Sequence, residues 1–283
     1  MRSFALTTLL TCCAALAYAQ VFGPALPPAP ALGMAGATVA YPHLDAGSGG
    51  NDALPALAGA GEVGFAASSG LPFALGDWRT ARFQGYFGLD RLSAIGMDYA
   101  FSGIPEYGEQ NARLQYARRL TDKLYLGAGF DFMRASAPEY GTANTFSFGL
   151  GALARALPDL WIGAQISNPF QQRLGSDIMR NQVRLGACWE ASRTFSLSGE
   201  AEKELLRPLQ LKAGFVYRPV ERIWFRAGAR SNPPRASMGM SLSPWGGLRL
   251  DMAAEWHSAL GVTPTFSLIW QKQKAKVGER ESN

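Results

Sequence analysis

From residue 61 onward, apolar and polar side chains alternate along the chain in segments of about ten residues. In the segment 123–133 the even-numbered positions are Leu, Leu, Ala, Phe and Phe, whereas the odd-numbered positions include Lys, Gly and Asp. Successive side chains of a β-strand point to opposite faces, so each segment is predicted to be a strand with one apolar and one polar face. The apolar faces include Phe130, Phe148, Leu185 and Leu250.

Fourteen such segments are predicted, starting near residues 61, 80, 92, 111, 123, 144, 160, 181, 194, 208, 222, 235, 248 and 262. Tight turns alternate with longer links, which are expected at 102–110, 134–140 and 168–180. A tilted strand needs about 9–11 residues to cross a bilayer. Short turns at one end and longer loops at the other are typical of transmembrane barrels. The predicted fold class is therefore all-β, a transmembrane antiparallel β-barrel of about 14 strands with both ends on the periplasmic side.

A secreted β-sandwich is the alternative, because it also contains alternating strands. The composition favours the barrel: charged residues make up 17% of the chain, below the roughly 25% of ordinary soluble domains. The apolar face also persists through all the predicted strands. Tryptophans near the predicted periplasmic ends would form the aromatic girdle of a membrane interface, namely Trp161, Trp189, Trp245 and Trp270.

Residues 1–19 have the features of a cleaved secretory signal peptide. A basic start is followed by an apolar run over 4–16 and by the small-x-small sequence Ala-Tyr-Ala at 17–19. The apolar run is too short to span a membrane as a helix. Two of the three cysteines fall within this signal, so the mature chain keeps only Cys188 and has no internal disulfide. Export and the barrel pattern together predict a location in the bacterial outer membrane.

The segment 20–60 differs from the barrel that follows it over 61–271. It begins with a Pro-rich lead, carries little charge, and becomes rich in Ala and Leu over 51–60, where one or two helical turns are expected. Its low charge favours burial, so we predict a hatch or plug inside the lumen, with Met34, Asn51 and Pro55 as hatch residues. A mobile periplasmic tail is the alternative. Residues 272–283 are predicted to form a charged periplasmic tail.

The polar faces of the strands carry charges of both signs. Buried charges persist in proteins by pairing, so ion pairs across neighbouring strands are expected. Hairpin geometry places Glu200 opposite Lys212. The predicted lumen charge network consists of Glu200, Lys212, Arg222, Arg226, Arg230, Arg249, Asp251 and Glu255. A water-filled pore also has a polar interior, so this network alone does not distinguish a pore from a plug.

Catalytic chemistry is not predicted. The chain has two histidines, His43 and His257, and although His257 shares a strand face with Asp251 and Glu255, no nucleophile-elbow serine motif occurs. The Gly-rich stretch 47–50 lacks the Lys-Ser/Thr of a phosphate loop. The basic residues are scattered, which argues against nucleic acid as a partner. No catalytic, cofactor or metal site is expected, and the predicted partners are outer-membrane lipid and a protein of the outer membrane or periplasm.

Several short stretches resemble a known group. The stretches 32–37, 51–58 and 61–65, together with 255–261 near the end, resemble FadL-like outer-membrane barrels and within them are closest to the PorV/PorQ group associated with type IX secretion. The resemblance implies a barrel with an N-terminal hatch. The hatch of that group usually carries Asn-Pro-Ala, whereas here Asn51 is followed by Asp52 and Ala53, which puts the tight turn of that element in doubt.

Two functions follow from the resemblance. In the first, the plugged barrel is a scaffold or shuttle for a protein partner, as in the PorV/PorQ group. In the second, it is a passive channel for small hydrophobic solutes, as in FadL-like transporters. The second function requires an apolar pocket near the hatch and a lateral route through the wall. The mixed charges of the lumen favour the scaffold.

Overall fold

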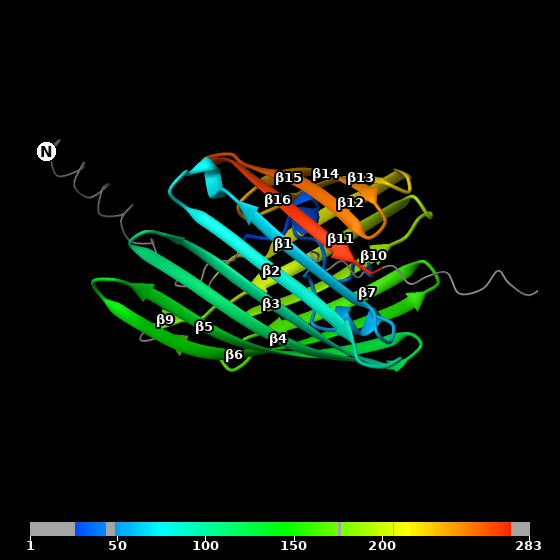
Figure 1. Cartoon of the computed structure of the whole chain (residues 1–283), viewed down its shortest axis with the longest axis horizontal. Helices are drawn as coiled ribbons and strands as arrows, with labels where there is room; N and C mark the ends of the chain where they lie inside the picture. Colours follow the sequence, from blue (N-terminus) through cyan, green and yellow to red (C-terminus); the bar gives the residue numbers. More distant parts are fainter. Residues whose placement is uncertain (1–25, 44–48, 175–176, 206, 273–283) are drawn as a thin grey trace, which may run out of the picture.

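The computed structural model describes residues 26–43, 49–174, 177–205 and 207–272. Fourteen antiparallel strands form one closed barrel, in which the first strand, β1, pairs with the last, β16 (Figure 1). The predicted fold class is thus confirmed, and each predicted start lies within four residues of the observed one. The barrel strands are β1 (Val63–Gly70), β2 (Arg79–Gly88), β3 (Ser93–Ile104), β4 (Tyr107–Thr121), β5 (Leu124–Ala137), β6 (Gly141–Leu157), β7 (Leu160–Ser167), β10 (Gln182–Trp189), β11 (Phe195–Glu204), β12 (Gln210–Val220), β13 (Ile223–Arg230), β14 (Arg235–Trp245), β15 (Leu248–His257) and β16 (Gly261–Gln271).

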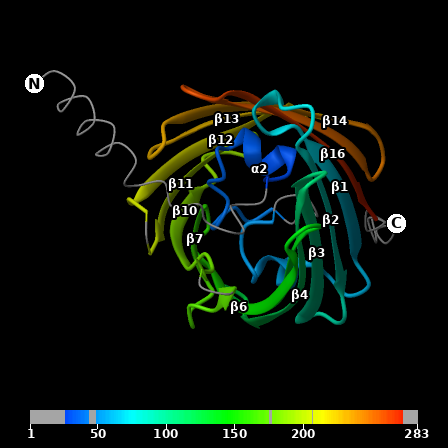
Figure 2. The same ribbon diagram turned by 90° about the vertical axis from the view of Figure 1, so that its left-hand side faces the viewer.

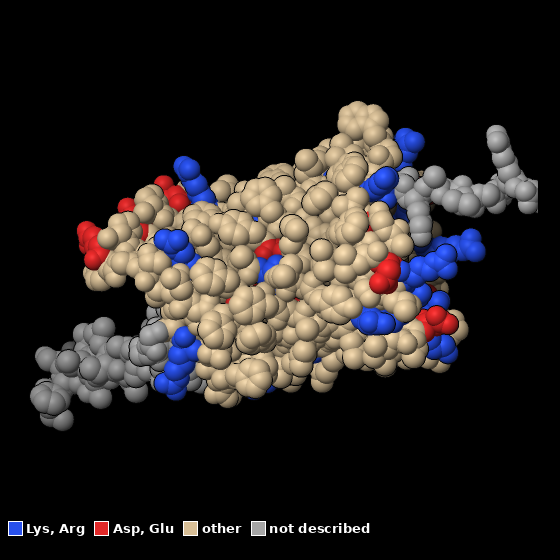
Figure 3. All heavy atoms as spheres, turned by 60° about the horizontal axis from the view of Figure 1, so that its bottom comes forward, with Lys and Arg blue, Asp and Glu red and all other residues tan. Residues whose placement is uncertain are grey.

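The alternation of side chains separates an apolar outer face from a polar lumen. Phe130, Phe148, Leu185 and Leu250 all point outward, with exposed fractions between 41% and 56%. On the face shown in Figure 3, charged atoms gather toward the two ends of the barrel and a mostly uncharged belt lies between them. This belt is what strands need where they face lipid, because a charge on the lipid face of a barrel is destabilising.

Two of the longer links predicted from the sequence were wrong. Strands β3 to β6 continue past the predicted ends, so 102–110 shrinks to a turn at 105–106 and 134–140 to a turn at 138–140. The strands continue because each backbone group still finds a partner on the neighbouring strand, as in the pairing of Gly103 with Gly108. The link after β7 is long, as predicted, and contains the small hairpin of β8 (Arg173–Leu174) and β9 (Asp177–Ile178).

Three of the four tryptophans predicted for the girdle lie on the outer face that a girdle requires. Trp189, Trp245 and Trp270 are exposed on the outer face, whereas Trp161 is buried in the lumen. Trp161 occupies an inward-pointing position of β7, because side chains alternate along a strand and its neighbour Ile162 points outward. Its indole packs on the ring of Tyr125, which is also buried.

The described residues that precede β1, 26–43 and 49–60, lie inside the barrel (Figure 2). Figure 2 looks along the barrel and shows this segment within the ring of strands. We call residues 26–43 and 49–60 the hatch. It contains helix α2 (Ala29–Gly33) and the 3-10 helix η2 (Leu54–Leu57), the latter within the stretch predicted to form helical turns. A second 3-10 helix, η3 (Pro72–Ala74), lies between β1 and β2.

The apolar core lies between the hatch and the inner wall. Its buried members include Met34, Val39 and Leu54 from the hatch and Leu153 and Val216 from the wall. Within the described residues, no helix is long and apolar enough to cross a membrane. The predicted signal peptide and all but the first residue of the predicted C-terminal tail lie outside the described residues.

Closure of the barrel has a consequence that can be seen on a gel. We expect the folded protein to migrate faster in SDS without heating than after boiling, because a closed barrel offers no free strand edge at which unfolding can begin. The measurement is the mobility of one sample before and after boiling. Equal mobility at both temperatures would contradict a closed barrel.

Candidate functional site

The wall meets the hatch at glycines that point into the lumen. A Cβ atom added to Gly127 would clash with the carbonyl oxygen of Asp52, and one added to Gly163 would clash with that of Val39. These wall positions carry glycine because the backbone of the hatch occupies the space of a side chain. The hatch is therefore packed directly on the wall backbone over a large part of its length.

The three predicted hatch residues all lie at such contacts. Met34 sits over Gly214 and Gly228, where an added Cβ would meet its backbone. The ring of Pro55 lies 3.1 Å from the Cβ position of Gly96. Asn51, described next, bonds to two strands at once.

Asn51 joins the hatch to the backbone of the wall. Its side-chain Nδ2 donates to the carbonyl oxygens of Val39 at 2.8 Å, Ala152 at 2.9 Å and Ala164 at 3.2 Å. Its Oδ1 accepts from the backbone N–H of Ala53 at 3.0 Å, which closes an Asx turn. The tight turn is therefore present although the middle residue is Asp and not Pro.

Asp52 makes the most concentrated contact between hatch and wall. Its carboxylate accepts from Arg113 at 2.6 and 3.0 Å, from Gln115 at 2.8 Å and from Gln165 at 2.6 Å. Arg113 also pairs with Asp131 at 2.7 Å. Asp52 is buried, and a buried carboxylate needs such partners. Asp52 was not among the predicted site residues, although an acid in the segment 20–60, which contains no Lys or Arg, is itself a signal that a basic partner lies elsewhere in the chain.

Glu200 binds both the wall and the hatch. Its pairing register with Lys212 is the one predicted, and the ammonium lies 2.9 Å from its Oε1. The same carboxylate pairs with Arg184 at 2.7 Å. Its Oε2 accepts from the backbone N–H groups of Thr38 at 3.0 Å and Val39 at 2.9 Å. Glu200 thus satisfies two donors of the hatch, which hairpin geometry alone does not predict.

A second group of charges spans strands β13 to β15. Arg230 pairs with Glu255 at 2.6 Å, and Arg226 pairs with Asp251 at 3.2 Å across the intervening strand. The hydroxyl of Ser241 on β14 bonds to both members of the latter pair. These are the arginines and acids of the predicted network, and small residues on β14 leave room for the long side chains.

Of the two remaining residues of the predicted network, Arg249 lies in the lumen and Arg222 does not. Arg249 pairs with Asp251 of its own strand at 2.9 Å. Arg222 was wrongly assigned, because it is exposed in the turn before β13. Strand β13 begins only at Ile223, so the inward alternation does not extend to Arg222. Arg235, which was not selected, shares Glu255 with Arg230 at 2.7 Å.

The two histidines have separate structural surroundings. His43 of the hatch lies 3.1 Å from Glu190, which follows β10, and the Trp161 indole donates to the same carboxylate at 2.9 Å. The hydrogen bond from His43 lowers the pKa of Glu190 below its usual value, and the indole bond acts in the same direction. His257 accepts two backbone N–H groups, of Ala259 and Leu260, in the turn after β15. No group of acidic, His or Cys side chains that could hold a metal occurs among the described residues.

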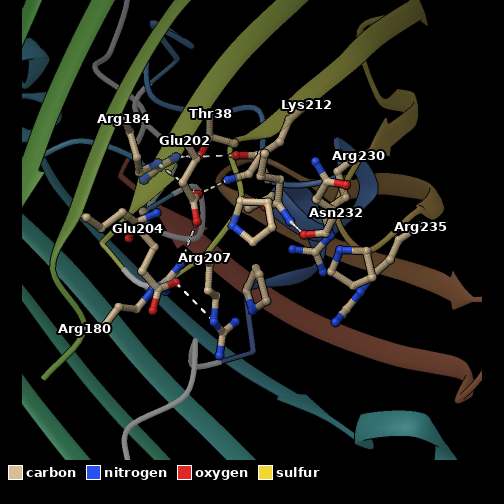
Figure 4. A pocket seen from close by; sticks show the side chains of 18 of the residues that line it. Thr38, Arg180, Arg184, Glu202, Glu204, Arg207, Lys212, Arg230, Asn232 and Arg235 are labelled. Carbon is tan, nitrogen blue, oxygen red and sulfur yellow. Dashed lines mark hydrogen bonds and ion pairs between the residues drawn. The ribbon is translucent and has the colours of Figure 1, made fainter. Parts of the chain in front are cut away.

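Two cavities differ sharply in character. One, of about 180 Å³, opens at the end of the lumen opposite the tight turns and is lined mostly by charged and polar side chains (Figure 4). The other, of about 480 Å³, is an apolar hollow on the outer face over β4, β5, β6, β7 and β10. Small outward residues form much of its floor, among them Ala128, Ala152 and Ala164. This outer hollow lies on the opposite side of the wall from Asn51 and Asp52.

Filling a contact glycine is expected to displace the hatch. Gly127→Val should cost about 1–3 kcal/mol, because the added atoms occupy the place of the Asp52 carbonyl and force the two backbones apart. The measurement is the rate at which a protease cleaves the hatch of the folded barrel in detergent. Gly199→Val is the matched control, since nothing lies within 4 Å of a Cβ added there. An equal cleavage rate in both variants would contradict docking on the wall.

Comparison with known proteins places the fold. No protein-family model matches the chain, and no curated protein matches it. Solved structures do. The CymD monoaromatic hydrocarbon channel is 14% identical with a TM-score of 0.63, covering 88% of this chain and 98% of its own. The Ralstonia pickettii toluene transporter TbuX is 12% identical with a TM-score of 0.62, covering 89% of this chain and 99% of its own. A Pseudomonas aeruginosa FadL homologue is 11% identical with a TM-score of 0.64, over 89% and 99%.

The chain therefore has the fold of FadL-type outer-membrane channels. The likeness covers most of this chain and nearly all of each of the three structures. All three are named as channels, transporters or a homologue of one, and none as an enzyme. The part of the resemblance that pointed to PorV/PorQ and type IX secretion has no support in these comparisons.

Proposed function

We propose that the chain is an outer-membrane channel of FadL type that carries small hydrophobic solutes passively, with the docked hatch as its closed state. One observation carries the proposal. An apolar hollow on the outer face lies directly outside the part of the wall on which the hatch is docked. The fold that the chain shares with hydrocarbon and toluene channels supports the same function.

The wall between the hollow and the hatch is thin. Its inner face carries Gly127 and Gly151, and its outer face carries alanines, so little more than a single layer of backbone separates lipid from the hatch. The free energy of a hydrophobic solute falls by about 25 cal/mol for each Å² of apolar area that it buries against an apolar surface. A route from lumen to lipid at this place would therefore be short and would end in a surface that holds such a solute.

The contacts of the hatch suit a gate. The hydrogen bonds and ion pairs that join the hatch to the wall are concentrated at three groups, the Asn51 amide, the Asp52 carboxylate and the Glu200 carboxylate. Hydrogen bonds to charged groups contribute about 1.5–3 kcal/mol each, so the hatch stays docked until these few bonds are exchanged for bonds to water. Displacement of the hatch would open the lumen and uncover the thin wall together.

A scaffold for a protein partner is the second candidate. The observation that favours it is the ion-paired docking of the hatch, which fills the lumen at the level of Asp52 and Glu200. The channel is preferred because a route for hydrophobic solutes would use the apolar hollow beside the docked hatch. The two candidates differ in one measurable property, which is transport.

The test is the initial rate at which whole bacterial cells take up radiolabelled toluene, since the lipopolysaccharide leaflet itself slows such solutes. Cells that carry the protein are expected to take it up faster than cells that lack it. Ala164→Trp fills the hollow and should lower the rate, whereas Ala229→Trp, on the outer face of β13 away from the hollow, should not. Equal uptake with and without the protein would overturn the channel and favour the scaffold.

A further inference from the structure

The cavity at the mouth of the lumen, which we call the vestibule, is lined by residues of the hatch and of the strands from β10 to β14, with Arg82 of β2. Among the described residues, seven basic side chains line it and only two carboxylates, Glu202 and Glu204. Figure 4 shows basic side chains from several strands around the same space, including Arg180, Arg184, Arg207, Lys212, Arg230 and Arg235.

Each carboxylate of the vestibule pairs with more than one of these cations. Glu204 lies 3.3 Å from Arg180 and 3.6 Å from Arg207. Glu202 forms ion pairs with Arg180 and Lys212. Three carboxylates behind the lining, Asp98, Glu200 and Glu255, pair with the remaining lining cations. The ion pairs of the seven lining cations thus run to five carboxylates among the described residues.

Donor atoms also remain unused at this place. The Nε–H groups of Arg230 and Arg235 are buried and have no hydrogen-bond partner. Both arginines already share the single carboxylate of Glu255. A buried N–H without a partner costs free energy, and these two would gain a hydrogen bond only if their side chains turned toward an acceptor in the vestibule.

We propose that the vestibule binds a small dianion of the phosphate class, either free phosphate or a phosphate monoester. A multiply charged anion suits this lining, in which seven basic side chains stand beside two carboxylates among the described residues. The planar fork of arginine matches the geometry of phosphate oxygens, and the arginines converge here from several strands. The volume of about 180 Å³ equals that of about six water molecules, enough for a phosphate group with a small substituent. This site does not depend on the proposed transport of hydrophobic solutes.

The test is isothermal titration calorimetry of the full mature chain in neutral detergent micelles. Inorganic phosphate is titrated at pH 7.5 against chloride at matched ionic strength. We expect one phosphate per chain, bound more tightly than chloride. The double variant Arg207→Gln/Arg235→Gln should bind about tenfold more weakly, because two charged donors are lost. Both substitutions leave each carboxylate a partner, since Arg180 keeps Glu204 and Arg230 keeps Glu255.

Arg173→Gln is the matched control, because Arg173 lies in the hairpin of β8, outside the vestibule lining. It should bind phosphate as the unaltered chain does, and all variants should keep the gel mobility of a folded barrel. Competition by glycerol phosphate supports a soluble ligand, and competition by phosphatidic acid in the micelle supports the same chemistry on a lipid headgroup. Phosphate bound no more tightly than chloride, or unchanged in the double variant, overturns the site.

Discussion

Deletion of residues 26–43 and 49–60, together with the link between them, is expected to open a steady ion current through the barrel, whereas the intact chain should carry almost none. The hatch fills the lumen with buried side chains and with backbone packed on the wall glycines. Without it, the polar inner face of the fourteen-strand barrel would line water. The measurement is single-channel conductance in a planar bilayer.

The control keeps the hatch and changes it only at its edge. His43→Ala loses the bond to Glu190 at the rim but leaves the contacts of Asp52 and Glu200 in place. This variant should stay closed. Steady current through the intact barrel, at a level that deletion does not raise, would show that the hatch does not close the lumen.

Asp52→Asn is expected to weaken docking of the hatch by about 3 kcal/mol or more. The substitution keeps the shape of the side chain but removes the charge that faces Arg113, and it turns one acceptor into a donor that points at other donors. Because Asp131 still pairs with Arg113, we expect the loss of docking free energy to lie at the lower end of the range for a broken buried ion pair. The measurement is protease cleavage of the hatch in the folded barrel, which reports the fraction that is undocked.

A second variant, in which the charges around Asp52 are removed together, distinguishes the loss of an ion pair from a general loss of stability. Asp52→Asn/Arg113→Gln/Asp131→Asn removes all three charges of this group, so Asp131 is not left as an unpaired buried carboxylate and much of the docking free energy should return. Asp90→Asn, in the exposed turn before β3, should leave docking unchanged. A single variant that docks as well as the unaltered chain would contradict the role of Asp52.

The sequence predicts the barrel well because a two-residue period is a property of the strand itself. Alternation locates the strands, and short hairpins then set the register, as for Glu200 opposite Lys212. The same reasoning fails at strand ends, where a strand stops earlier than the pattern suggests or extends into a polar stretch without clear alternation. Arg222 lies one residue outside its strand, and β3 to β6 run on past the polar stretches that were taken for loops.

The hatch is less predictable because long-range contacts decide its path. Nothing in the local pattern says that Asn51 would reach carbonyl groups of β6 and β7 or that Glu200 would accept from Thr38. The inward glycines were a partial signal, since they indicate close approach of another backbone without naming it. Trp161 shows the limit of composition arguments: its place near a strand end suggested a membrane interface, and its parity placed it in the lumen.

The central claim is that the hatch closes the lumen and opens it by leaving the wall. The most direct test places a cysteine at Ala53, which is fully buried beside Asp52, in a background where the buried Cys188 is replaced by serine. The measurement is the rate at which a small water-soluble methanethiosulfonate labels that cysteine in the folded barrel. We expect no labelling while the hatch is docked and rapid labelling once Asp52→Asn is added. Ready labelling of Ala53→Cys without that second change would contradict a closed lumen.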